Sequence, residues 1–202
     1  MYLLVETIRI ENGKILNISF HNERVTRSLY NIYGLMKKPE LEKIIDVPDS
    51  ANQGIFKCRL IYDDKSTRVE FLPYELRPVG SLKIVFSDEI CYPYKYTNRD
   101  KISRLFDMRG ECDDILIVKY GRLCDSSYAN VVLMDTGGSW VTPSACLLPG
   151  TRRANLLKSG FVKEADIFYS DLSKYIELKL INAMIDIDET EGIPVSNIIA
   201  GS

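Results

Sequence analysis

Three short groups of residues in the second half of the chain carry side chains suited to chemistry. They read Lys-Tyr-Thr-Asn-Arg at 95–99, Cys-Asp-Ser-Ser-Tyr-Ala-Asn at 124–130 and Leu-Leu-Pro-Gly-Thr-Arg-Arg at 147–153. A lysine between aromatic residues can present a desolvated, free-base amine that reacts with carbonyl groups. A carboxylate can keep a ring nitrogen protonated. A Gly-Thr turn that opens a helix offers N–H groups and the positive end of the helix dipole to a phosphate.

An amine, a carboxylate and a phosphate-binding helix start are the groups needed to hold pyridoxal 5′-phosphate. This combination predicts Lys95 as the Schiff-base lysine and Asp125 as the partner of the pyridine nitrogen. Taken singly, the same residues are also compatible with a solvated lysine, a turn aspartate and an ordinary capped helix. The prediction therefore depends on the three occurring together.

In the order and spacing of these motifs, from about Val5 to about Val195, the chain resembles the class IV aminotransferases, the fold-type-IV pyridoxal phosphate enzymes. The residues at 95–99 are similar to Lys-His-Leu-Asn-Arg of the 4-amino-4-deoxychorismate lyase branch. Asp125 and Asn130 keep the spacing of the family's Glu-x-x-x-x-Asn, with Asp in place of Glu.

The resemblance also implies further cofactor-binding residues around the third motif. Leu148 matches a leucine that packs on the pyridine ring. Gly150, Thr151 and Arg152 stand where the family has Gly-Ile-Thr. Because Thr151 replaces Ile and Arg152 replaces Thr, we expect backbone N–H contacts to the phosphate from both positions.

Residues in both halves of the chain complete the site that the resemblance implies. Arg24 matches the phosphate-binding arginine of the family's His-x-x-Arg, and Asn182-Ala183 matches an Asn-Ala on the far side of the phosphate. Arg59 lies at the substrate-carboxylate position, and Arg68 matches a second arginine of the lyase branch. Two cations suit a substrate with two carboxylates.

Composition excludes several other classes of protein. The net charge of −2 and the pI near 5.6 give no electrostatic reason to expect nucleic acid or an anionic membrane as a partner. The apolar runs are too short to span a bilayer, and the start does not read as a signal peptide. Five widely spaced cysteines are typical of reduced thiols, which favours a cytoplasmic protein without a metal site.

Hydrophobic periodicity and turn signals predict an α+β protein with two lobes. A small α/β lobe is expected over 1–88 and a larger cofactor-binding lobe over 89–202. The predicted strands are 2–10, 14–20, 54–62, 66–72, 82–87 and 115–120, the last paired with 129–134; the predicted helices are 22–35, 98–108, 151–159 and 171–180. The resemblance implies the two-lobed fold of D-amino-acid aminotransferases with the cofactor between the lobes, a shortened amino-terminal lobe, and a homodimer.

Three functional hypotheses follow from the residues and the resemblance. The first is an enzyme like 4-amino-4-deoxychorismate lyase, which releases pyruvate and forms 4-aminobenzoate in folate biosynthesis. The second is a branched-chain or D-amino-acid aminotransferase that uses the same Lys95 on a small amino substrate. The third is a catalytically degenerate family member, because the family's substrate tyrosine falls in the segment that the shortened lobe lacks.

Overall fold

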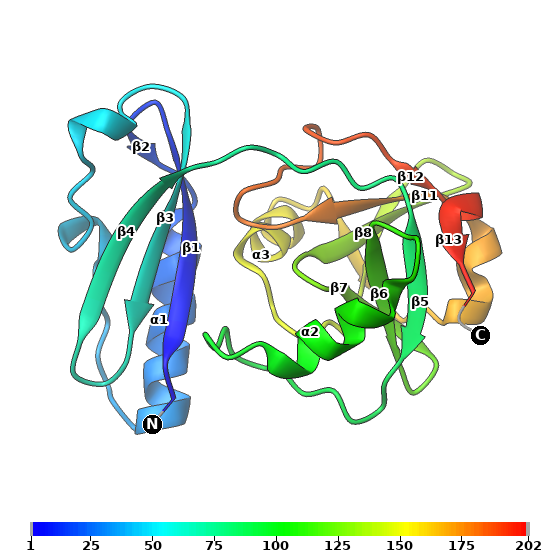
Figure 1. The fold of residues 1–202 in the computed structure, drawn as a ribbon, viewed down its shortest axis with the longest axis horizontal. Helices are drawn as coiled ribbons and strands as arrows, with labels where there is room; N and C mark the ends of the chain where they lie inside the picture. The colour runs from blue at the N-terminus through cyan, green and yellow to red at the C-terminus, as the bar shows by residue number, and fades with distance from the viewer. Residues whose placement is uncertain (1, 201–202) are drawn as a thin grey trace. The chain divides into compact units, whose positions relative to one another are not determined.

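The structure is a computed structural model that describes residues 2–200 and divides the chain into two compact units. The first unit contains the residues up to Leu76 together with Tyr94–Asn98, and the second contains Arg77–Pro93 and the residues from Arg99 onward (Figure 1). The division follows Leu76 and not the predicted 88/89 boundary, because the strand Leu82–Phe86 pairs inside the sheet of the second unit.

In the described residues of the first unit, a four-stranded sheet has the strand order β2-β1-β3-β4. Its elements are β1 (Leu4–Glu11), β2 (Lys14–Ile15), α1 (Ile18–Tyr33), η1 (Leu41–Lys43), η2 (Asp49–Ala51), β3 (Ile55–Tyr62) and β4 (Thr67–Pro73). All pairings in this sheet are antiparallel. The single helix among these elements that exceeds one turn, α1, packs on one face of the sheet.

The strand period explains the core of the first unit. Side chains alternate between the two faces of a strand, so Leu4, Ile8 and Ile10 share one face of β1. They pack with Val25 and Leu29 of α1 in one buried cluster. Because this face is closed by the helix, any polar side chain that shares it must find its partners inside the unit.

The second unit is built on a larger mixed sheet with the strand order β10-β9-β8-β7-β6-β5-β13, to which β11 and β12 attach through β8. Its elements are β5 (Leu82–Phe86), α2 (Asp100–Phe106), η3 (Asp107–Arg109), β6 (Asp114–Lys119), β7 (Arg122–Ser126), β8 (Asn130–Asp135), β9 (Trp140–Pro143), α3 (Thr151–Lys158), β10 (Lys163–Ala165), η4 (Tyr169–Lys174), β11 (Tyr175–Ile181), β12 (Ile193–Pro194), η5 (Val195–Asn197) and β13 (Ile198–Ile199). The mixture of helices and strands confirms the predicted α+β class.

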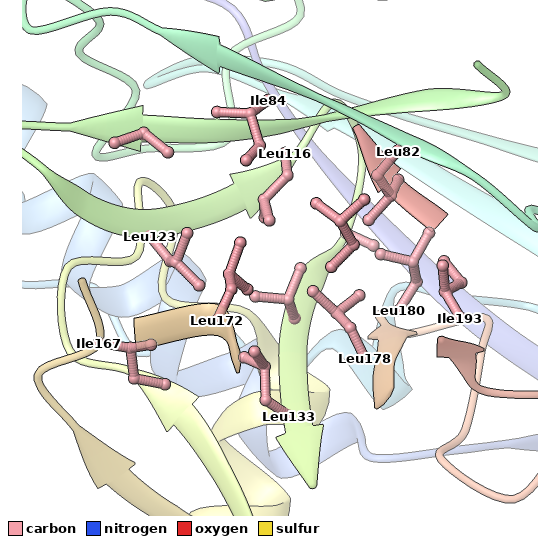
Figure 2. Close-up of a cluster of buried hydrophobic side chains, with 14 residues drawn as sticks. Leu82, Ile84, Leu116, Leu123, Leu133, Ile167, Leu172, Leu178, Leu180 and Ile193 are labelled. Atoms are coloured by element: carbon pink, nitrogen blue, oxygen red, sulfur yellow. The ribbon is translucent and has the colours of Figure 1, made fainter. Parts of the chain in front are cut away.

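The core of the second unit is aliphatic. Figure 2 shows leucine and isoleucine side chains from neighbouring strands converging, among them Leu82, Leu116, Leu123 and Leu133. Each of these four side chains is fully buried. Such close packing fixes the ends of the strands on which the candidate site residues lie.

The predicted helix at 171–180 is wrong. Residues 169–174 form a 3₁₀ segment, and β11 then runs antiparallel to β8. The reason is the alternation of polar and apolar residues in this stretch, which buries Leu178 and Leu180 at a spacing of two, as a half-buried strand requires.

Two other strand predictions are also corrected. The strand expected at 14–20 is limited to β2, because Asn17 adopts a left-handed conformation (φ 53°) and α1 begins at Ile18. The pairing expected between 115–120 and 129–134 does not occur, because β7 lies between them. The sequence of β7, with Asp and Ser at its end, reads as a turn and conceals the strand.

Candidate active site

Asp125 is a buried carboxylate of the second unit. It lies near the end of β7, directly opposite Asn130 at the start of β8. Its Oδ1 accepts a hydrogen bond from Asn130 Nδ2 at 2.8 Å, and its Oδ2 accepts backbone N–H bonds from Leu147 at 2.9 Å and Leu148 at 3.0 Å. The five-residue spacing of the motif is therefore the span of a tight hairpin that brings the two side chains together.

Burial raises the pKa of Asp125 to about 6, against the lowering effect of these hydrogen bonds and of the charge on Arg153. Among the described residues, the donors that reach the carboxylate are uncharged amides. A buried carboxylate held only by neutral donors gains from a cation placed against it. Asp125 is thus suited to binding a protonated ring nitrogen.

The start of α3 adjoins this carboxylate. Asn130 uses Nδ2 again to bind the Leu148 carbonyl at 2.8 Å, which fixes the loop ahead of the helix. At Gly150, the residue before the helix, a Cβ atom would lie 2.0 Å from Asn130 Oδ1, so only glycine allows this approach. The first turn of α3 begins at Thr151, so the N–H groups of this turn lie at the start of the helix.

The turn after β11 begins beside Asn130. Ile181 lies opposite Asn130, and Asn182 then forms a tight turn closed by two backbone bonds with Ile185. Asn182 Oδ1 accepts the N–H of Met184 at 2.8 Å. Ala183 therefore lies in the turn that follows β11, near Asn130 at the start of β8.

Arg152 binds within the protein through its side chain. Its guanidinium donates to Asp186 and, at 2.7 Å, to Asn155 Oδ1. These bonds tie the first turn of α3 to the segment that follows Asn182. The guanidinium of Arg152 is therefore engaged by protein side chains, and a phosphate contact from its backbone N–H stays a prediction.

Lys95 belongs to the first unit, where it extends the edge of the sheet. Val5 N donates to the Lys95 carbonyl at 2.9 Å, and Thr97 N donates to the Leu3 carbonyl at 2.8 Å. An isolated antiparallel bridge joins Leu4 to Tyr96. The lysine is therefore held by its main chain beside β1.

A buried ionic cluster lies on the core face of the first unit. Glu6 accepts bonds from Arg24 Nε at 2.8 Å, from Arg24 Nη2 at 2.6 Å and from His21 Nδ1 at 2.5 Å. Desolvation acts to raise the pKa of Glu6, but Arg24 and His21 outweigh it and hold the pKa at about 2. Burial lowers the pKa of His21, and the charges of Arg24 and Lys95 act in the same direction.

Sequence reasoning missed Glu6. It shares its strand face with Leu4, Ile8 and Ile10, and it is fully buried. A glutamate at the apolar positions of an alternating strand is the signal that could have found it, because such a residue needs a buried cation. Arg24 is predicted to bind the phosphate, and the structure shows that its Nε and Nη2 donate to Glu6.

Arg59 and Arg68 lie on neighbouring strands of the first unit and share one acidic partner. Glu70 accepts from Arg59 Nη1 at 3.1 Å and from Arg68 Nη2 at 2.8 Å. The expected pair of cations therefore exists. Sequence reasoning missed the carboxylate between them, although its place two residues after Arg68 puts both on one face of β4.

The structure groups the predicted residues into two sets. Within the first unit lie Lys95, Arg24, Arg59 and Arg68; within the second lie Asp125, Asn130, Leu148, Gly150, Thr151, Arg152, Asn182 and Ala183. Arg99, the last residue of the lysine motif, belongs to the second unit and donates to the Ser127 carbonyl. It thereby supports the hairpin that carries Asp125.

Two further properties of the described residues bear on function. Across residues 2–200, no group of three or more His, Cys, Asp or Glu side chains is arranged to hold a metal ion. No helix in the same range has both the length and the apolar character of a membrane span.

Comparisons with known proteins agree with the fold. The family described as amino-transferase class IV matches residues 94–198. An uncharacterised protein of Haemophilus influenzae is 39% identical over 186 residues, which are 91% of this chain and 98% of that protein.

Two solved structures are similar over most of the chain. One, from Haemophilus somnus, is provisionally assigned as a 4-amino-4-deoxychorismate lyase; it is 36% identical with a TM-score of 0.85 and is matched over 91% of this chain and 97% of that one. The other is a hypothetical aminotransferase of Mycobacterium tuberculosis in its PLP-bound form, with 17% identity, a TM-score of 0.76 and coverage of 98% and 81%. The second likeness shows the fold alone.

The structure is that of an α+β protein in which a hairpin carrying Asp125 and Asn130 lies beside the start of α3 at Gly150. The chain belongs to the class IV aminotransferase family of enzymes.

Proposed function

We propose that the protein is a pyridoxal phosphate-dependent lyase that converts 4-amino-4-deoxychorismate to pyruvate and 4-aminobenzoate. The observation that carries the cofactor assignment is the environment of Asp125, a buried carboxylate with a raised pKa and neutral donors. A protonated pyridine nitrogen is the cation that this carboxylate would bind. The PLP-bound form of the Mycobacterium tuberculosis protein, which has the same fold, supports this assignment.

The other residues fit the remaining parts of the cofactor. The N–H groups of Thr151 and Arg152 and the turn at Asn182-Ala183 would hold the phosphate, and Leu148 and Asn130 would line the ring. Arg24, whose guanidinium is oriented by Glu6, would add a charged donor to the phosphate. Backbone N–H groups and one guanidinium would therefore bind the phosphate, and one carboxylate would accept a hydrogen bond from the ring nitrogen.

Lys95 would supply the amine that anchors the cofactor's aldehyde carbon. When bound, pyridoxal phosphate supplies an electron sink for bonds at the substrate carbon that bears the amino group. Released from that anchor by the substrate amine, Lys95 would take and return a proton as general base and general acid. Its fixed main chain beside β1 limits the positions that the amine can reach.

The substrate assignment rests on Arg59 and Arg68. Two arginines on one sheet face suit a substrate with two carboxylates, which aminodeoxychorismate has. The similarity to the Haemophilus somnus structure supports the same assignment. A branched-chain or D-amino-acid aminotransferase with the same Lys95 is the alternative. We also propose that the enzyme is a homodimer, as the resemblance to the family implies, and that it is cytoplasmic, as its widely spaced cysteines favour.

Borohydride reduction tests the cofactor assignment. The cofactor-loaded protein should become covalently labelled on Lys95, and Lys95→Ala should fold but show neither label nor turnover. Lys101, on the helix that follows, provides the matched control: Lys101→Ala should leave the label in place. A label on any other lysine would contradict the assignment of Lys95.

An assay with aminodeoxychorismate tests the reaction. Pyruvate and 4-aminobenzoate should form in equal amounts. Arg68→Ala should lower kcat/KM by a factor that corresponds to about 2–4 kcal/mol of transition-state stabilisation, because a charged partner of the substrate is lost. If Arg68→Ala is silent and the protein instead transfers amino groups to 2-oxo acids, the aminotransferase alternative replaces the lyase.

A further inference from the structure

Arg59, Arg68 and Glu70 are brought to one face of the sheet by the register of β3 and β4. Arg59 lies directly opposite Glu70, and Arg68 is opposite Ile61. Residues opposite one another, and residues two apart on one strand, lie on the same face. The opposite face of β3 carries Cys58 and Leu60, which are buried in the core. The three charged side chains are therefore on the face away from α1.

Glu70 divides its two carboxylate oxygens between the arginines. Oε2 receives Arg59 Nη1 at 3.1 Å and Oε1 receives Arg68 Nη2 at 2.8 Å. The side chains are 37% exposed for Arg59, 76% for Arg68 and 24% for Glu70. Ion pairs this accessible to water are weak, so an incoming carboxylate can replace Glu70 on either arginine.

We infer that Glu70 is a specificity-determining residue: without substrate it covers the positions that two substrate carboxylates take on Arg59 and Arg68. The inference rests on the proposed substrate role of these arginines. A monocarboxylate displaces Glu70 from one arginine and then lies close to the negative charge that remains on the other. A dicarboxylate takes both arginines and releases Glu70 to solvent. Glu70 thus selects against substrates with one carboxylate.

Direct binding of simple anions to the cofactor-loaded enzyme tests this inference. Acetate and succinate are titrated by calorimetry into the wild type, Glu70→Gln, Arg59→Ala and Arg68→Ala. Glu11→Gln is the matched control, because Glu11 pairs with Arg9 at 3.0 Å on the same face of the sheet and loses the same charge.

The quantity compared is the preference for succinate, the ratio of the acetate Kd to the succinate Kd. Glu70→Gln should tighten acetate binding and reduce this preference by roughly three- to fivefold, the scale of an exposed ion pair. Glu11→Gln should leave the ratio at the wild-type value. An unchanged ratio in Glu70→Gln, or weaker acetate binding, overturns the inference.

The arginine variants separate failure of this inference from failure of the proposed function. If both weaken succinate binding while Glu70→Gln leaves the ratio unchanged, the arginines bind carboxylates and only the role of Glu70 is wrong. If neither affects succinate binding, or succinate does not bind the wild type, the substrate site lies elsewhere and both conclusions fail.

Discussion

Glu6 in the first unit and Asp125 in the second are both buried carboxylates, and burial has opposite outcomes at the two sites. In the first unit Glu6 has a pKa of about 2, because Arg24 and His21 outweigh its desolvation. In the second unit desolvation prevails at Asp125 and raises its pKa to about 6. The two side chains are similarly inaccessible, so the difference comes from the charge of their partners.

Glu6 is a carboxylate that a buried cation inside the protein already neutralises. Asp125 is a carboxylate whose hydrogen-bond donors are uncharged. The negative charge of Glu6 is balanced by Arg24, which it orients within the core of the first unit. Asp125 is held in place by amides that fix its geometry without neutralising it. Under the proposed function, a cofactor with a protonated ring nitrogen would supply a cation to Asp125 and not to Glu6.

The largest expected effect is on stability at Glu6. Glu6→Gln removes the anion from a buried pair and leaves Arg24 without its charge partner, which costs about 3–5 kcal/mol. Urea unfolding of the apoprotein measures the loss. Glu40→Gln, which breaks the exposed pair with Lys43, should cost about 0–1 kcal/mol. Equal losses in the two variants would remove the distinction between a buried and a surface ion pair.

The pH dependence of stability should have opposite signs at the two carboxylates. The pKa of Asp125 rises from 3.8 to about 6 on folding, so the folded state binds its proton more tightly. The stabilisation is complete below pH 3.8 and is lost as pH rises through 6, by about 3 kcal/mol for a shift of about 2.2 units. The pKa of Glu6 falls from 4.5 to about 2, so its contribution is present above pH 4.5 and is lost as pH falls toward 2.

Unfolding free energies of the apoprotein between pH 3 and pH 7 measure both contributions. Asp125→Asn should reduce the loss of stability between pH 4 and pH 6, to which Asp114 also contributes because burial raises its pKa. Glu6→Gln should reduce the loss below pH 4.5. If Asp125→Asn keeps the wild-type slope between pH 4 and pH 6, Asp125 does not have the raised pKa that the comparison requires.

A smaller effect is expected on cofactor affinity. Asp125→Asn replaces a charge-assisted hydrogen bond to the ring nitrogen and should weaken pyridoxal phosphate binding by about 1.5–3 kcal/mol. Turnover should fall by orders of magnitude, while the phosphate contacts keep binding measurable by absorbance titration. Asp113→Asn is the control, because the Asp113 carboxylate accepts from Gly80 and Ser81, away from Asp125; its variant should bind the cofactor as the wild type does.

Much of the candidate site is predictable because it depends on local rules. A five-residue spacing between Asp125 and Asn130 fits a hairpin, and Gly150 marks a helix start that glycine alone permits. Motif spacing therefore selected residues that the structure brings into one unit, although their roles stay predictions. The fold class followed from the mixture of periodic segments, and the helix at α3 from its flanking glycines.

The parts that sequence reasoning missed depend on contacts between distant segments. β11 was mistaken for a helix because its short apolar run satisfies both periods, and only its pairing with β8 decides between them. Glu6 meets His21 and Arg24 across the core, and Glu70 meets Arg59 across two strands. A local sequence pattern cannot predict which residue a charged side chain will pair with. These ion pairs can be identified only once the register of the strands and the packing of the helix are known.

The protonation state of the bound cofactor's ring nitrogen tests the central claim most directly. Pyridoxal phosphate labelled with ¹⁵N at the ring is bound to the wild type and to Asp125→Asn, and the ¹⁵N chemical shift is measured at pH 7.5. The wild type should show a protonated nitrogen, and Asp125→Asn should show an unprotonated one. An unprotonated ring nitrogen in the wild type, or the same shift in both proteins, would contradict the role of Asp125.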